Sequence, residues 1–191
     1  MKNKSINLID DVSKHMFDKF NIYNDKYDIT GKITLTIYSC NSDGIPDCIR
    51  YSTGVASTTF SVFFDDDDDI IDDIISYVYV PIENIFKTFI DSSYDYNYLM
   101  EYFDMILLHE IGHIIYARKN YIGKSINDIM ELDEINEELK MRIPKLRKNA
   151  SRKSRIKWYR SYFSLPIEKG ANDSVGITID DIIHMETKML K

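Results

Sequence analysis

Apolar and polar positions alternate along the first half of the chain with two different periods. Residues 5–20 place apolar side chains at helical spacing, which predicts an N-terminal helix. Residues 32–39, KITLTIYS, alternate with a period of two and are rich in β-branched side chains, which predicts a strand. The segment 41–47, NSDGIPD, contains the Asp-Gly pair typical of a turn. Further strands are expected at 48–53, 57–64 and 75–86. Pro81 confines the last of these to a sheet edge or ends it.

The second half of the chain has helical patterns instead. Long helices are expected over 95–118 and 125–143, the second stopping before Pro144. A short helix at 165–176 has Pro166 in its first turn and Gly176 at its end. The last segment, 177–191, is expected to form a C-terminal helix.

Strands followed by helices predict an α+β protein. At 191 residues, a single domain is expected over 1–191. Residues 1–95 would supply its helix and sheet, and residues 96–191 its helical part.

Composition narrows the class of protein. The 44% hydrophobic and 29% charged content is typical of a soluble globular chain. No apolar run reaches the length of a membrane helix, and Asp10 and Asp11 interrupt any signal peptide. A cytoplasmic location is therefore expected, with Cys40 and Cys48 as reduced thiols and a disulfide across the turn as the alternative.

The net charge of −7 is unevenly distributed. Residues 65–73, DDDDDIIDD, are strongly acidic. Residues 139–167 contain no acidic side chain, and 140–160 carry ten basic ones. Within the acidic run, residues 65–69, DDDDD, are interpreted as a solvated loop between strands, with a calcium site as the alternative. The basic segment is interpreted as a solvated helix and linker, with nucleic-acid binding as the alternative.

The stretch 107–119, LLHEIGHIIYARK, carries the candidate chemistry. His109, Glu110 and His113 follow the order H-E-x-x-H. On a helix the two histidines face the same way, about 6 Å apart, and two neutral imidazoles there can bind one zinc ion. Glu110 lies one position round the helix, within reach of a zinc-bound water. The alternative is a pair of histidines that hydrogen-bond to carbonyl groups at the edge of a core.

The surrounding residues exclude two zinc-enzyme classes. A metzincin would place a glycine and a third histidine where this chain has Tyr116 and Lys119. A peptide deformylase would supply a cysteine ligand in an E-G-C context, and the sequence around Cys40, IYSCNSDG, does not match it. The third ligand is therefore expected downstream of the motif.

Three glutamates are candidates for that ligand. Glu131 and Glu134 lie on an acid-rich helix, and such a run is usually a solvated face. Glu168 lies in LPIEKGAND, where small residues would let its helix pack closely against another. Asn172, four residues on, shares its face and could accept a hydrogen bond from a ligating histidine.

H-E-[IL]-G-H followed by E-x-x-A-[ND] resembles the gluzincin metallopeptidases, especially the small ImmA/IrrE-like and minigluzincin types, which include phage-encoded members. The resemblance covers mainly residues 97–118 and 164–176. It implies a zincin-like fold, with a small twisted, mostly antiparallel sheet on the active-site helix, and the strand YVYVP at its edge alongside the substrate. It also implies that Glu168 is the third zinc ligand and that Asn172 lies behind the ligands and orients one of them. A departure is the 54 residues between His113 and Glu168, which keep Glu131 and Glu134 open.

The expected function is zinc-dependent hydrolysis of peptide bonds in a protein or peptide substrate, with Zn²⁺ as the cofactor. Glu110 would take a proton from the zinc-bound water and deliver it to the leaving amine. His184 is the predicted oxyanion donor, with Tyr159 and Tyr162 as alternatives. The other expectation is a zincin scaffold with little turnover that binds a protein partner or, through 140–160, a nucleic acid.

Overall fold

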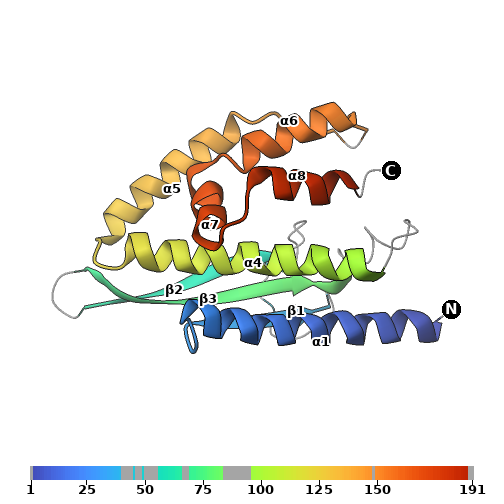
Figure 1. The fold of residues 1–191 in the computed structure, drawn as a ribbon. Helices are drawn as coiled ribbons and strands as arrows, with labels where there is room; N and C mark the ends of the chain where they lie inside the picture. The colour runs from blue at the N-terminus through green and yellow to red at the C-terminus, as the bar shows by residue number, and fades with distance from the viewer. Residues whose placement is uncertain are drawn as a thin grey trace. The chain divides into compact units, whose positions relative to one another are not determined.

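The computed structural model describes residues 2–39, 45, 49, 56–65, 69–83, 96–147 and 149–188. Within them it shows six helices and one three-stranded sheet, which confirms the α+β class (Figure 1). The predicted turn at 41–47 and strand at 48–53 lie outside the described residues, apart from Ile45 and Ile49. Cys40 and Cys48 lie outside them too.

The first half of the chain forms the elements that its periodicity predicts. Helix α1 spans Lys2–Tyr27 and strand β1 spans Ile33–Tyr38. Strand β2 spans Ser57–Phe64 and strand β3 spans Ile71–Pro81. The acidic run therefore extends into a strand, because Asp72 and Asp73 belong to β3.

The strand order is β1-β3-β2, so β3 is the central strand. The prediction that the YVYVP segment lies at a sheet edge is therefore wrong. Pro81 is tolerated because β3 ends there. β1 and β3 are parallel, with Ile33 opposite Ser76, so the prediction of a mostly antiparallel sheet does not hold for this pair. β2 and β3 are connected through residues 65–70, too short a link for parallel neighbours, which implies an antiparallel hairpin.

The second half is helical, as predicted. Helix α4 spans Tyr96–Tyr121, and α5 spans Ile126–Met141 behind the N-cap residue Ser125. Helices α6 (Arg152–Tyr162), α7 (Pro166–Val175) and α8 (Ile179–Lys188) follow. Helix α7 ends at Gly176 in the left-handed conformation (φ 78°), where glycine has no steric penalty.

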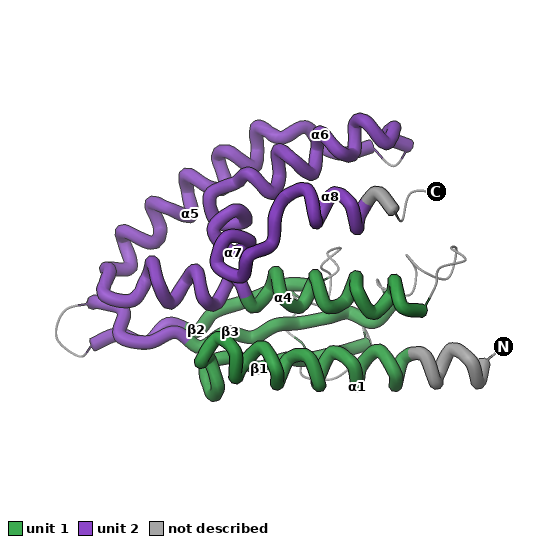
Figure 2. The backbone as a smooth tube through the Cα atoms, in the orientation of Figure 1, with its two compact units in different colours: residues 1–61, 75–111 green, residues 62–74, 112–191 purple. Residues whose placement is uncertain are grey.

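The described chain forms two compact units (Figure 2). Unit 1 comprises residues 1–61 and 75–111, and unit 2 comprises 62–74 and 112–191. Their boundary runs through the β2–β3 hairpin and through α4, which is one unbroken helix. The expectation of a single domain over 1–191, with its helix and sheet in 1–95 and its helical part in 96–191, stays a prediction.

Each unit has its own buried apolar residues. In unit 1, α1 packs on β1. The carboxylate of Asp104 in α4 contacts the side chains of His15 and Lys19 in α1. The most buried apolar side chains of unit 1 include Met16, Val78, Val80, Phe103 and Leu107. In unit 2, α6 packs on α8, and the buried apolar residues include Ile71, Ile114, Ala171 and Ile182. Among the described residues, no helix is long and apolar enough to cross a membrane.

Candidate metal centre

Helix α4 presents His109 and His113 on successive turns. Both side chains are half-buried, whereas Ile111 and Ile114, on the other side of the helix, are fully buried. The apolar side therefore fixes the helix in the protein, and the histidine side remains accessible to a ligand. Because α4 is continuous, helix geometry sets the position of His109 relative to His113.

Helix α7 places Glu168 beside His113 within unit 2. Nε2 of His113 lies 3.7 Å from Oε2 of Glu168, and the two side chains are only 13% and 14% exposed. Including His109 on the preceding turn of α4, the three residues each offer a ligand atom within 4.8 Å of the other two. Among the described residues this is the only such group of three or more His, Cys, Asp or Glu side chains.

Small residues allow α7 to approach α4 this closely. A Cβ atom on Gly112 would lie 2.2 Å from the carbonyl oxygen of Ala171. A Cβ atom on Gly170 would lie 2.2 Å from the ring of Tyr116. The expectation that the small residues beside Glu168 permit close helix packing is therefore confirmed. Tyr116 therefore packs closely against α7 at Gly170.

The donor set fits zinc. Two imidazole nitrogens and one carboxylate oxygen form a ligand combination found in catalytic zinc sites. At the usual zinc–ligand distances, tetrahedral ligand atoms lie about 3.3 Å apart. The 3.7 Å between His113 and Glu168 is close to that value, and all three ligand atoms lie within 4.8 Å of one another.

Glu110 lies in the same helix and is buried, with 7% of its surface exposed. Its Oε2 accepts a hydrogen bond of 2.5 Å from the hydroxyl group of Thr58 in β2, within unit 1. A buried carboxylate whose orientation is fixed by a hydrogen bond can exchange a proton with a group bound beside it. No pattern in the sequence connects Thr58 with Glu110, because their contact depends on how β2 packs against α4.

The two other downstream glutamates lie elsewhere. Glu131 and Glu134 are exposed on α5 and do not belong to the group around His113. Asn136 of α5 contacts the glutamate helix, since its Oδ1 accepts a hydrogen bond from the backbone N–H of Ile167. The described geometry therefore favours Glu168 over both alternatives.

Asn172 lies one turn after Glu168 in α7 and is 1% exposed. Its burial agrees with the expectation that it faces inward with Glu168. The expected hydrogen bond from a histidine ring to its side-chain carbonyl stays a prediction.

The three candidate oxyanion donors have different surroundings. His184 is exposed on α8. The hydroxyl group of Tyr159 donates to Oε2 of Glu186 at 2.8 Å, in the packing of α6 on α8. The hydroxyl group of Tyr162 donates to Oε1 of Glu168 at 2.9 Å, which places Tyr162 in direct contact with the group of three. The oxyanion role of each stays a prediction.

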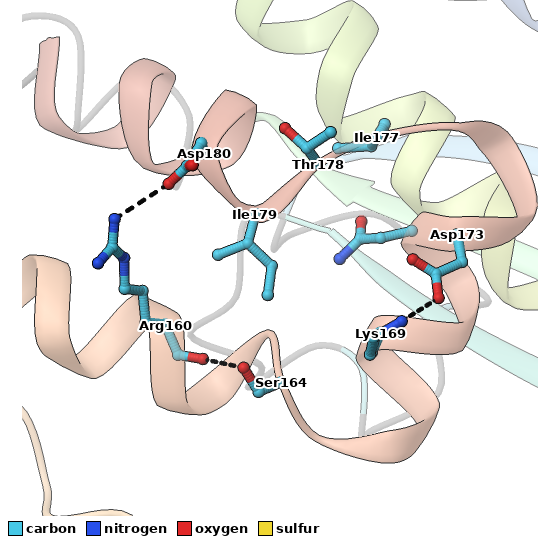
Figure 3. A pocket seen from close by; sticks show the side chains of 9 residues that line it. Arg160, Ser164, Lys169, Asp173, Ile177, Thr178, Ile179 and Asp180 are labelled. Carbon is cyan, nitrogen blue, oxygen red and sulfur yellow. Dashed lines mark hydrogen bonds and ion pairs between the residues drawn. The ribbon is translucent and has the colours of Figure 1, made fainter.

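A separate cavity of about 580 Å³ lies among α6, α7 and α8 (Figure 3). Its charged side chains form ion pairs with one another. Arg160 contacts Asp180 at 3.1 Å, and Lys169 contacts Asp173.

The described basic side chains of 140–160 are mostly exposed, and their possible contact with nucleic acid stays a prediction. Residues 66–68 of the acidic run lie outside the described part, so calcium binding there also stays a prediction.

The chain was compared with known proteins at three levels. It matches no protein-family model, no curated protein and no solved structure. The evidence for its function is therefore the arrangement of its own residues.

Proposed function

We propose that this protein is a zinc metallopeptidase that hydrolyses peptide bonds. The observation that carries the proposal is the convergence of His109, His113 and Glu168, with the buried Glu110 in the same helix. His109, His113 and Glu168 would hold the ion. When bound, zinc lowers the pKa of a coordinated water to about 7 and polarises a carbonyl group.

Glu110 would then carry the proton. It accepts one from the attacking water and donates it to the amine that leaves when the peptide bond breaks. Its burial restricts its carboxylate to a few orientations, and the hydrogen bond from Thr58 occupies Oε2. Oε1 then remains the oxygen for proton transfer.

The position of strand β2 supports the proposal that the substrate binds in an extended conformation. Among the described strands, β2 pairs with β3 alone, at one end of the strand order, and we infer that a peptide could pair with its other edge. Thr58 of β2 contacts Glu110 directly, so a peptide pairing with this edge would run close to the general base. This edge takes the place expected for the YVYVP strand.

Zinc content and peptidase activity test the proposal together. Purified protein should contain about one zinc per chain and cleave an unfolded protein such as reduced casein. Glu110→Gln should keep the zinc and lose cleavage, because glutamine cannot accept the proton. Glu168→Gln should lose zinc affinity, and Glu134→Gln, a matched change on the exposed face of α5, should lose neither.

Two results would contradict the proposal in different ways. If the folded protein had no affinity for zinc, His109 and His113 would have a structural role instead. Stoichiometric zinc without cleavage of any unfolded protein would favour the alternative expected from the sequence, a binding or regulatory protein on the same scaffold.

A further inference from the structure

The two carboxylate oxygens of Glu168 have different partners. Oε2 lies 3.7 Å from Nε2 of His113, on the side of the metal group. Oε1 accepts a hydrogen bond of 2.9 Å from the hydroxyl group of Tyr162, the last residue of α6. All three residues belong to unit 2.

Aromatic packing fixes the position of Tyr162. Its ring stacks on Trp158, with 5.1 Å between centroids and 8° between planes. Phe163 packs against it edge-on, at 5.2 Å and 87°. A tyrosine held on two sides loses little further conformational entropy when its hydroxyl group makes a hydrogen bond.

Helix α6 is in turn fixed to α8. The two helices pack against each other, and Arg160 of α6 forms an ion pair with Asp180 of α8. The hydroxyl group of Tyr162 therefore belongs to a helix whose position is fixed by its contacts with α8. A donor with a fixed position can fix the carboxylate that accepts from it.

We propose that Tyr162 is a positioning residue for the metal ligand Glu168, which it holds so that Oε2 alone faces the ion. The inference rests on the proposed zinc site and adds a role for the segment between His113 and Glu168, whose length departs from the gluzincin pattern. Part of that segment, α6, supplies the residue that orients the third ligand.

The role has a structural consequence that can be measured. With Oε1 held by Tyr162, Glu168 offers one oxygen to the ion. Without the hydroxyl group, the carboxylate can rotate or offer both oxygens, which changes the coordination number. Loss of a hydrogen bond behind a metal ligand typically weakens metal binding roughly 10–100-fold.

Tyr162→Phe tests the proposal, with Tyr159→Phe as the matched control. Each change removes one hydroxyl group from α6 that donates to a carboxylate, but only Tyr162 contacts the metal group. Zinc affinity of the full chain is measured by competition with a chromophoric chelator at neutral pH. The visible spectrum of the Co²⁺-loaded protein reports coordination geometry, and circular dichroism confirms folding. Phenylalanine keeps the ring that stacks on Trp158, so both variants are expected to fold.

Tyr162→Phe should weaken zinc binding roughly 10–100-fold and alter the cobalt spectrum, whereas Tyr159→Phe should change neither. Equal affinities and spectra for the two variants would overturn the positioning role and leave the proposed metallopeptidase intact. Wild-type protein that binds no zinc would overturn the proposed function, and this inference with it.

Discussion

The hydroxyl group of Thr58 donates a hydrogen bond of 2.5 Å to Oε2 of Glu110, joining strand β2 to helix α4. The glutamate of the H-E-x-x-H motif is thus held from a strand that lies 52 positions earlier in the chain. A hydrogen bond to a charged group contributes about 1.5–3 kcal/mol, enough to select one orientation of the carboxylate.

Thr58→Val should therefore lower kcat by about one to two orders of magnitude while zinc content is unchanged. Valine has the shape of threonine without its hydroxyl group, so Glu110 would lose its donor but not its packing. Thr58→Ser should restore most of the activity. Thr59→Val, on the other face of the strand, is the control. Unchanged kcat in Thr58→Val would exclude a role for Thr58 in positioning Glu110.

Gly112→Ala should destabilise the protein, although alanine normally stabilises a helix by about 1 kcal/mol relative to glycine. The added methyl group would overlap the carbonyl oxygen of Ala171, which belongs to the backbone of α7. Overpacking of this kind costs about 1–3 kcal/mol, and it would move Glu168 away from His113. Denaturant unfolding and zinc affinity measure the two effects. An increase in stability would show that the two helices separate easily.

Removal of zinc should lower the melting temperature of the wild-type protein. A ligand that binds only the folded state stabilises it, by about 2.7 kcal/mol at 100 times its Kd. The zinc-dependent shift should be small or absent in Glu168→Gln and fully present in Glu134→Gln. Differential scanning fluorimetry with and without chelator measures it. A full shift in Glu168→Gln would place the third ligand elsewhere.

Alkaline pH should weaken the packing of α6 on α8 through Tyr159. Burial raises the pKa of its phenol, and the neighbouring carboxylate of Glu186 raises it further. A raised pKa in the folded state means that the stabilising contribution is complete below the unfolded pKa of about 10 and is lost as the pH rises above it. The stability of wild-type protein relative to Tyr159→Phe should therefore fall between about pH 9 and pH 12. A constant difference over that range would contradict the assignment.

Local pattern was sufficient for most of the helices and strands. The period of two in 32–39 became β1, and the strand expected at 57–64 became β2. The Pro166 and Gly176 signals bounded α7 to within a residue. These features depend on neighbours along the chain, which the sequence displays directly. The spacing of His109 and His113 is of the same kind, because an unbroken helix fixes it.

Strand order and the contacts of the candidate site depend on packing between distant segments. The sequence contained no signal that β3 would lie between β1 and β2 and pair in parallel with β1. It offered Glu131, Glu134 and Glu168 as third ligands, and the close approach of Gly112 to Ala171 brings Glu168 beside His113.

The sequence by itself thus determined the local elements and the two histidines with their glutamate on one helix. Only the tertiary structure decided what surrounds them: Thr58 at Glu110 and Tyr162 at Glu168. The physical reason is the distance along the chain over which each kind of interaction acts. Helical and strand periodicity follow from backbone geometry over a few residues, whereas a hydrogen bond between distant segments exists only after steric fit has fixed how those segments pack.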